Sequence, residues 1–262
     1  MTIAGSDSGG GAGIQADLKT FQALGVYGTS TLTAITAQNT VGVTAVHEIP
    51  NGIVAAQIDA VVGDIGVDAL KTGMLSNAEI IGTVAERIRH WHLDRLVVDP
   101  VMVAKSGDRL LREDAVQALI RELLPLALVL TPNLPEAEVL VGRPLNTEDE
   151  IRQAANEIVA LGARAVLMKG GHRPGMARDL LFDGQTFHVF ESERIDTPNT
   201  HGTGCTLSAA IAAGLASGMD VVDAVGSAKR YVTEAIRQAT PLGSGHGPVA
   251  HDWPLSRHLL QA

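Results

Sequence analysis

The stretch Asn199-Thr-His-Gly-Thr-Gly-Cys-Thr-Leu-Ser-Ala-Ala-Ile-Ala-Ala213 runs from a polar turn through two glycines into an apolar, alanine-rich segment with the character of a helix. A turn that opens a helix leaves several backbone N–H groups without intrahelical partners, and the helix dipole adds partial positive charge there. Backbone groups arranged in this way bind anions, phosphate in particular. Gly202, Thr203 and Gly204 are therefore candidates for an anion-binding turn.

The only cysteine of the chain, Cys205, lies where this turn meets the helix. A helix N-terminus is expected to lower the pKa of a thiol placed there and to favour the thiolate. The alternative is that the glycines only end a loop and that Cys205 is a small buried apolar residue. A single cysteine excludes an internal disulfide and predicts a protein of the reducing cytoplasm.

The composition limits the class of protein. The chain has 262 residues, of which 45% are hydrophobic and 3% aromatic, so we expect one large domain over residues 1–262 with a core of Val, Leu, Ile and Ala. The formal net charge is −9, and no long cluster of Lys and Arg occurs, which argues against binding to nucleic acid or to membrane surfaces. No apolar run approaches the roughly 20 residues that cross a bilayer.

Strand and helix patterns alternate along the chain with short connections. Arg95–Asp99 has the unbroken apolar run typical of a parallel strand, with its acid at the C-terminal end. Further strands are expected at Ala69–Thr72, Leu126–Thr131 and Ala165–Lys169. A hairpin is expected around Asp183-Gly184, and a capping box formed by Thr147 and Glu150 predicts a helix start. This alternation predicts an α/β protein with a mostly parallel sheet and helices on both of its faces.

Polar residues interrupt this pattern mainly where strands are expected to end. In sheets of this type, ligands bind outside the carboxyl ends of the strands. The polar segments at those ends are Gly5-Ser-Asp7, Gln38-Asn39, Lys71-Thr-Gly-Met74, Asp99, Asn133 and Lys169-Gly-Gly171. We expect one cleft to collect them.

The residues of this predicted cleft suit phosphoryl transfer. The reaction needs a bound phosphate, neutralisation of its charge and removal of the acceptor's proton. Asp99 and Glu136 are candidate magnesium ligands, and Lys169 and Lys105 are candidates for the phosphate oxygens. Each also has an ordinary alternative as a helix cap, a first-turn acid or a surface lysine. A Walker A loop is absent, and the Cys205 turn lacks the Gly-x-Gly-x-x-Gly of Rossmann folds.

Seven motifs together carry a resemblance to a known family. They are Gly5-Ser-Asp-Ser-Gly-Gly-Gly-Ala-Gly-Ile-Gln-Ala-Asp-Leu-Lys19, Thr36-Ala-Gln-Asn-Thr40, Lys71-Thr-Gly-Met-Leu75, Asp99-Pro-Val-Met-Val-Ala-Lys-Ser-Gly107, Thr131-Pro-Asn-Leu-Pro-Glu-Ala137, Met168-Lys-Gly-Gly-His172 and Asn199-Thr-His-Gly-Thr-Gly-Cys-Thr-Leu-Ser-Ala209. In this order, and over essentially the whole chain, they closely resemble the hydroxymethylpyrimidine/phosphomethylpyrimidine kinases of thiamine biosynthesis.

The resemblance implies a fold and an activity. The fold is that of the ribokinase-like superfamily, with a central, mostly parallel sheet in a three-layer α/β/α arrangement, and the usual assembly is a homodimer. The activity is ATP-dependent phosphorylation of 4-amino-5-hydroxymethyl-2-methylpyrimidine and then of its monophosphate. Two alternatives stay open: a pyridoxal or pyridoxine kinase of the same fold, and a non-catalytic ligand-binding protein.

The resemblance also assigns roles to residues. Gly202, Thr203, Gly204 and Cys205 match the anion hole of the family, and Cys205 stands where many ribokinase relatives place an aspartate base. We expect Cys205 either to assist deprotonation or to position the acceptor. The residues that match the pyrimidine pocket are Gln38, Gly5, Asp17, Met74 and Val101.

At the nucleotide end, Asp99, Asn133 and Glu136 resemble the magnesium–phosphate network of the family, with Asp99 and Glu136 as ligands of Mg²⁺. Lys169 is expected on the phosphates. ATP and Mg²⁺ are therefore the implied cosubstrate and cofactor.

Overall fold

The computed structural model describes residues 1–102, 113–170 and 175–255. Within these ranges an eight-stranded sheet runs in the order β10-β9-β8-β7-β6-β5-β1-β2. The strands are β1 (Thr2–Ala4), β2 (Ser30–Leu32), β5 (Leu70–Thr72), β6 (Leu96–Val98), β7 (Val129–Leu130), β8 (Ala165–Met168), β9 (Ala177–Phe182) and β10 (Phe187–Ser192). Neighbouring strands are parallel along the run β8-β7-β6-β5-β1-β2. β9 is antiparallel to β8, and β10 is antiparallel to β9. The predicted, mostly parallel sheet is confirmed.

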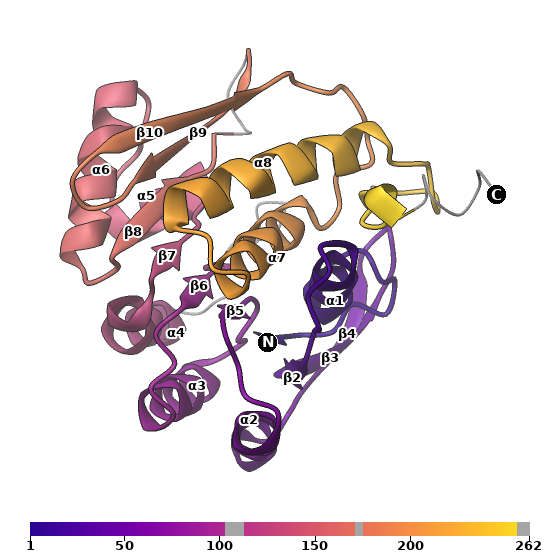
Figure 1. The fold of residues 1–262 in the computed structure, drawn as a ribbon, viewed down its shortest axis with the longest axis vertical. Coiled ribbons are helices and arrows are strands. Elements are labelled where there is room, and N and C mark those ends of the chain that lie inside the picture. Colours follow the sequence, from indigo (N-terminus) through magenta and orange to yellow (C-terminus); the bar gives the residue numbers. More distant parts are fainter. Residues whose placement is uncertain (103–112, 171–174, 256–262) are drawn as a thin grey trace.

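Helices cover both faces of the sheet and make three layers. One face carries α1 (Gly13–Ala23), α7 (Thr203–Ala216) and α8 (Val221–Arg237), which lie together on one side in Figure 1. The other carries α2 (Asn51–Asp64), α3 (Ala78–His90), α4 (Glu113–Ala118), α5 (Leu134–Val141) and α6 (Glu148–Ala160). This is the predicted three-layer α/β/α arrangement.

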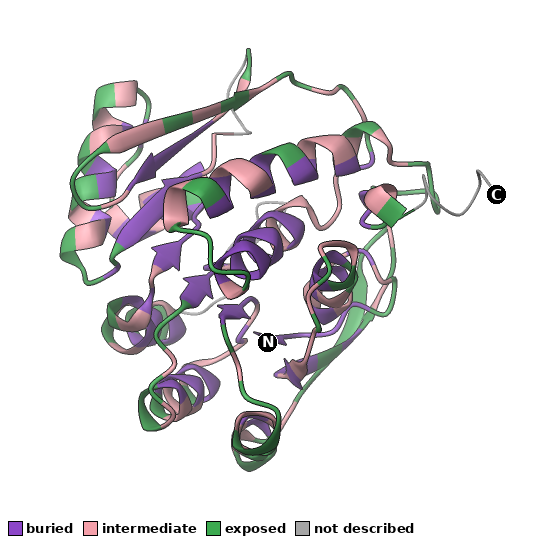
Figure 2. Ribbon diagram, in the orientation of Figure 1, coloured by how far each residue is buried: buried purple, intermediate pink, exposed green. Residues whose placement is uncertain are grey.

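The core is divided between the two faces because side chains alternate along each strand. In β6, Val97 packs on the α7 side, whereas Leu96 and Val98 pack on the α3 side. All three are fully buried, so the strand reads as an unbroken apolar run. Figure 2 shows the strands buried in the middle and the helices exposed on their outer sides. All of these helices pack on one eight-stranded sheet, and one domain over residues 1–262 stays a prediction.

The segment before β7 differs from the strand expected over Leu126–Thr131. After α4, a π-helical turn covers Leu119–Leu123 and a 3₁₀ turn covers Leu124–Leu126. Pro125 lies within the 3₁₀ turn and donates no backbone hydrogen bond, which suits the end of a helix better than a strand ladder. The strand is accordingly reduced to Val129–Leu130.

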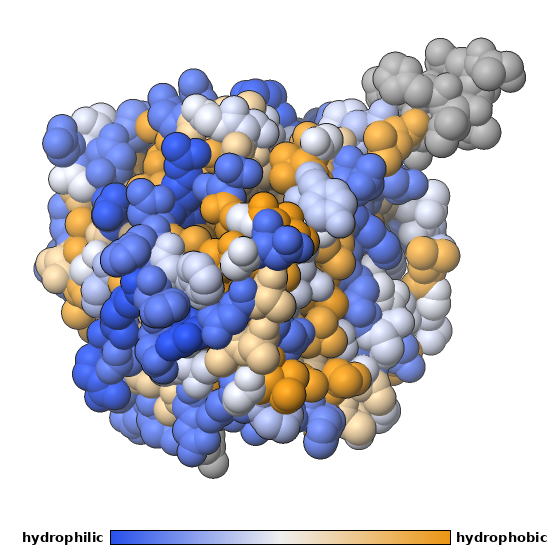
Figure 3. All heavy atoms as spheres, turned by 60° about the horizontal axis from the view of Figure 1, so that its bottom comes forward, coloured by the Kyte–Doolittle hydropathy of each residue, from blue (hydrophilic) through white to orange (hydrophobic). Residues whose placement is uncertain are grey.

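Two further strands form a separate antiparallel ribbon, β3 (Ala34–Gln38) with β4 (Val43–Glu48). Every residue of β4 is exposed, and Figure 2 shows this ribbon as an exposed element beside α1. Elsewhere the surface mixes hydrophilic and apolar side chains, as the face in Figure 3 shows. No helix among the described residues is both long and apolar enough to cross a membrane.

Candidate active site

Two glycine-rich turns meet at the carboxyl edge of the sheet. In the turn after β1, the Asp7 carboxylate accepts hydrogen bonds from the backbone N–H groups of Gly9 at 2.8 Å, Gly11 at 3.1 Å and Ala12 at 2.8 Å. The second turn packs directly on the first, because a Cβ atom placed on Gly202 would lie 1.8 Å from the carbonyl oxygen of Gly11. Gly202 also has a φ of +78°, so both space and conformation require glycine.

The second turn has the form of the predicted anion site. Gly202 is the N-cap of α7, no side chain caps the helix, and no acidic residue occupies its first turn. The backbone N–H groups there are therefore not neutralised by a carboxylate of the same helix. A Cβ on Gly204 would lie 3.5 Å from Lys169 Nζ and 3.7 Å from Asp99 Oδ2, so this turn borders the charged residues at the strand ends.

Asp99 and Lys169 form the centre of that charged group. They follow β6 and β8 respectively, and Lys169 Nζ lies 2.9 Å from Asp99 Oδ1. The Asp99 side chain is almost fully buried, and it also accepts from Thr131 Oγ1 at 3.3 Å and from Ser208 Oγ at 3.4 Å. Burial alone would raise the pKa of Asp99, but the ammonium groups of Lys169 and Lys71 outweigh it, so the pKa is lowered and the carboxylate stays charged.

Glu136 and Asn133 lie at the same edge and form a capping box at the start of α5. The Asn133 side chain accepts from the backbone N–H of Glu136 at 2.9 Å, and Glu136 Oε2 accepts from that of Asn133 at 2.8 Å. The alternative role of Glu136 as a first-turn acid is thus real. Burial raises the pKa of Glu136 to about 7, an effect that Lys169 opposes and Asp99 reinforces.

The described residues hold no group of three or more His, Cys, Asp or Glu side chains arranged to bind a metal. Two carboxylates, Asp99 and Glu136, lie close enough to affect each other's titration. Mg²⁺ commonly takes only one or two protein carboxylates and completes its shell with water and substrate phosphates. The pair therefore fits a magnesium ion that arrives with a nucleotide, and it does not fit a site built from protein ligands alone.

On the other side of the glycine turns lies Gln38, at the end of β3. Its Oε1 accepts from Thr36 Oγ1 at 3.2 Å, and its Nε2 lies 3.4 Å from His201 Nε2. The same His201 nitrogen is 2.9 Å from Asp7 Oδ2. Gln38 is half-buried, so part of the residue is exposed. This chain of side chains joins the end of β3 to both glycine turns.

His201 belongs to the opening motif, yet the sequence assigned no function to it. Its partners Gln38 and Asp7 are 163 and 194 residues away along the chain, so no local spacing could have revealed them. Its backbone is held as well: the N–H donates to Gly247 O, and the carbonyl accepts from Val249 N. The C-terminal segment thus fixes the histidine that connects the two turns.

The remaining residues predicted for the substrate pocket divide into two groups. A Cβ on Gly5 would lie 2.5 Å from Met74 Cε, so these two residues pack closely, and Met74 and Val101 are half-buried with some exposed surface. Asp17 is completely buried instead. Its carboxylate pairs with Lys71 Nζ at 2.9 Å and accepts from Thr2 Oγ1 at 2.6 Å, so the structure does not bring Asp17 to the surface of the site.

Cys205 lies at the start of α7 as predicted, but its expected acidity is wrong. Burial of the thiol raises its pKa to about 11; Lys71 works against this, while the carboxylates of Asp17 and Asp99 add to it. Desolvation and the two negative charges outweigh the Lys71 ammonium. The Cys205 side chain is therefore a neutral thiol near pH 7.

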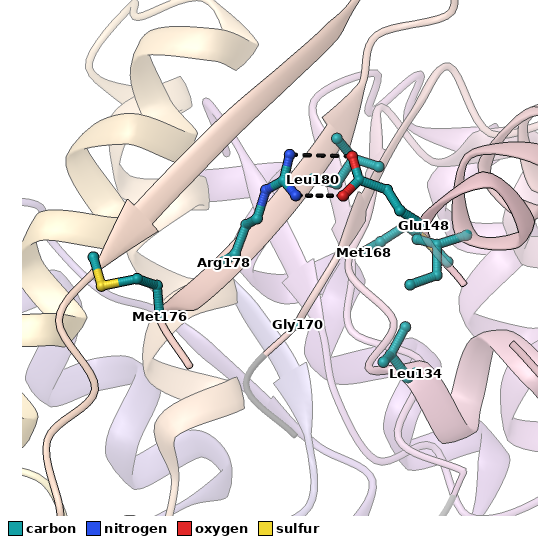
Figure 4. A pocket seen from close by; sticks show the side chains of 8 residues that line it. Leu134, Glu148, Met168, Gly170, Met176, Arg178 and Leu180 are labelled. Carbon is teal, nitrogen blue, oxygen red and sulfur yellow. Dashed lines mark hydrogen bonds and ion pairs between the residues drawn. The ribbon is translucent and has the colours of Figure 1, made fainter. Parts of the chain in front are cut away.

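A cavity of about 400 Å³ adjoins the Lys169 side of the site. It is lined by Leu134, Glu148, Ile151, Met168, Gly170, Met176, Arg178 and Leu180. Figure 4 shows the Arg178 guanidinium joined to the Glu148 carboxylate at its rim. Two of the lining residues, Leu134 and Gly170, directly follow Asn133 and Lys169 in the chain. The predicted residues Lys105 and Gly171 lie outside the described residues.

Comparisons with known proteins agree with this geometry. The family model described as phosphomethylpyrimidine kinase matches residues 7–250. A hydroxymethylpyrimidine/phosphomethylpyrimidine kinase of Rhizobium meliloti is 59% identical over 255 residues, which cover 96% of each chain.

Two solved structures are similar over almost their whole length. A phosphomethylpyrimidine kinase of Clostridium difficile superposes with a TM-score of 0.82 at 49% identity, covering 90% of this chain and 97% of that one. An ADP complex of a Bacillus subtilis pyridoxal kinase superposes with a TM-score of 0.89 at 48% identity, covering 95% of this chain and 96% of that one.

Proposed function

The chain belongs to the phosphomethylpyrimidine kinase family, and we propose that it transfers the terminal phosphoryl group of ATP to 4-amino-5-hydroxymethyl-2-methylpyrimidine and then to the monophosphate. The observation that carries this proposal is the meeting of the two glycine turns, with Lys169 and Asp99 on one side and Gln38 on the other. Acceptor and donor would thus approach each other across the N-terminus of α7. The products serve thiamine biosynthesis.

For the phosphate end, we propose that the backbone N–H groups at Gly202, Thr203 and Gly204 bind the transferring phosphoryl group. Lys169 would donate to the phosphate oxygens, because its ammonium lies beside Gly204 and its side chain is partly exposed. Donors held in place before the reaction stabilise charge in the transition state without having to reorganise. Asn133 would support this end by fixing the start of α5 and the orientation of Glu136.

Asp99 and Glu136 would hold Mg²⁺ together with phosphate oxygens of the nucleotide. The ion supplies neutralisation of the phosphate charge when it is bound. Asp99 is already ionised, whereas Glu136, with a pKa of about 7, must lose its proton when a cation binds. We therefore expect magnesium affinity to rise as the pH increases through 7.

For the acceptor end, we propose that the Gln38 amide binds the aminopyrimidine edge, since an amide both donates and accepts. Met74 and Val101 would pack on the ring, and Gly5 leaves room for Met74 beside it. Asp17 would act indirectly, by holding Lys71 beneath the site.

Gln38→Leu is expected to raise the Michaelis constant for the pyrimidine by about 100-fold and that for ATP by less than about threefold, because only the acceptor loses a paired hydrogen bond. Steady-state kinetics with each substrate varied in turn measures both constants. Gln22→Leu, the same change at an exposed position near the end of α1, is the matched control and should leave the pyrimidine constant close to wild type. Equal increases in both constants for Gln38→Leu would place this residue outside the pyrimidine site.

For Cys205 we propose a positioning role, because a neutral thiol is a poor base near pH 7. Cys205→Ala should keep kcat at saturating substrates within about tenfold of wild type, with an unchanged pH profile between about pH 6 and 9, whereas loss of a general base costs about 10² to 10⁴-fold. The measurement is kcat as a function of pH for both proteins. A loss of about 1000-fold at every pH would instead make Cys205 the base.

A pyridoxal kinase is the second candidate, because the Bacillus subtilis structure described above is named as one. Side-by-side turnover of the pyrimidine and of pyridoxal separates the two functions. We expect the pyrimidine to have the higher kcat/KM, since the Gln38 amide matches its donor and acceptor edge.

We further propose a homodimer in the cytoplasm. The β3–β4 ribbon presents Ile35, Val43 and Val46 with about half of each side chain exposed, at 48%, 52% and 55%. A second copy of the chain is the partner that would cover these apolar residues. A molar mass of 27.4 kDa by light scattering at micromolar concentration would contradict the dimer, and activity confined to an exported fraction would contradict the location.

A further inference from the structure

A buried ion pair lies between the sheet and α8, outside the residues assigned above. Lys229 Nζ of α8 is 2.7 Å from Asp179 Oδ2 of β9, and the two residues are only 8% and 5% exposed. Moving two charges out of water costs about as much as their attraction returns, so such a pair contributes little to stability on its own. A second contact of Asp179 indicates another role for the pair.

The other oxygen of Asp179 binds the backbone next to Lys169. Asp179 Oδ1 accepts from the N–H of Gly170 at 2.9 Å. The antiparallel pairing of β8 with β9 matches Val166 with Phe182 and Met168 with Leu180, so two residues further Gly170 would lie opposite Arg178.

The backbone does not continue that ladder. A Cβ on Gly170 would lie 1.8 Å from the Arg178 carbonyl oxygen, so the two chains approach closely and only glycine fits. Figure 4 shows Gly170 where β8 ends and Arg178 on the neighbouring strand. The Asp179 carboxylate accepts the hydrogen bond that a strand carbonyl accepts elsewhere in the ladder.

Lys169 is therefore held from both sides. Its own N–H donates to Pro132 O at 2.9 Å on the β7 side, and the next N–H, of Gly170, donates to Asp179 on the β9 side. These bonds fix the backbone from which the Lys169 ammonium reaches Asp99 at 2.9 Å. The Lys229 ammonium, 2.7 Å from Oδ2, holds the Asp179 carboxylate in this orientation.

We propose that Asp179 and Lys229 are positioning residues for ATP: they set the peptide after Lys169, and through it the ammonium that binds the phosphates. The inference rests on the proposed role of Lys169. It assigns a function in nucleotide binding to a pair that touches neither substrate.

Two double variants separate this function from a merely structural one. Asp179→Asn with Lys229→Gln removes both charges but keeps an amide oxygen for Gly170 N–H, and the asparagine amide can donate to the glutamine. Asp179→Leu with Lys229→Met also removes both charges but leaves Gly170 N–H without an acceptor. The second variant should raise the Michaelis constant for ATP about tenfold and the first by less than about threefold, with the pyrimidine constant nearly unchanged in both.

Thermal unfolding of both variants accompanies the kinetics. If the Asp179→Leu double variant does not fold, Asp179→Val with Lys229→Met replaces it, since a β-branched residue suits a strand. Equal Michaelis constants for ATP in the two double variants, whether both normal or both raised, would overturn the proposal. A rise in the Michaelis constants for ATP and for the pyrimidine together would also overturn it. Wild-type protein without pyrimidine kinase activity would refute the proposed function instead, so the two failures are distinguishable.

Discussion

Lys169→Met is expected to lower kcat/KM for ATP by about 1000-fold, because the ammonium that neutralises the transferring phosphoryl group is lost. Methionine keeps most of the length of the side chain. It removes the ammonium that lies 2.9 Å from the buried Asp99 carboxylate. The pKa of Asp99 should then rise, since Lys169 is the largest of the effects that lower it. The remaining activity should therefore fall further as the pH is lowered toward 5.

The control for this variant is Arg121→Met, which removes one positive charge from a side chain that is 72% exposed. It should leave kcat/KM for ATP unchanged. Lys169→Arg keeps the charge but not the geometry of an ammonium, and should recover part of the activity. A kcat/KM for ATP within about tenfold of wild type in the Lys169→Met enzyme would show that the phosphates are bound elsewhere.

Gly202→Ala is the second change from which we expect a large effect. The new methyl group would lie 1.8 Å from the Gly11 carbonyl oxygen, and the φ of +78° is one that alanine rarely adopts. The two glycine turns must separate to admit it. We expect a loss of unfolding free energy of about 3 kcal/mol or more, and a fall in kcat of about 100-fold because the anion turn is displaced.

Gly218→Ala isolates the contact from the backbone effect. Gly218 has a similar φ of +88°, but nothing lies within 4 Å of the position of its Cβ. Gly218→Ala should lower the free energy of unfolding by about 1 kcal/mol and leave kcat unchanged. Urea unfolding and kcat for the two variants measure both effects. Equal losses of stability in Gly202→Ala and Gly218→Ala would mean that the contact between the turns contributes nothing.

Much of the fold follows from local patterns in the sequence. The unbroken apolar run before Asp99 marks β6, and the short strands expected at Ala69–Thr72 and Ala165–Lys169 match β5 and β8. The Asp183-Gly184 turn marks the β9–β10 hairpin, and the capping box of Thr147 and Glu150 marks the start of α6. Each of these signals lies within a few residues of the feature it predicts. Polar residues at the strand ends likewise meet at one edge of the sheet, because parallel strands all end there.

The parts that could not be predicted depend on partners distant in the chain. Asp17 is buried in an ion pair with Lys71, 54 residues further along the chain. His201 contacts Gln38, which is more than 160 positions before it. The acidity of Cys205 depends on burial and on the carboxylates of Asp17 and Asp99, which come from distant parts of the chain. Sequence motifs placed the candidate residues at one edge of the sheet, but they did not show which of these residues are buried.

The most direct test of the proposed function is phosphate transfer from ATP measured separately with 4-amino-5-hydroxymethyl-2-methylpyrimidine, with its monophosphate and with pyridoxal. We expect both pyrimidines to be phosphorylated, each with a kcat/KM well above that for pyridoxal. Phosphorylation of pyridoxal with neither pyrimidine accepted would contradict the account.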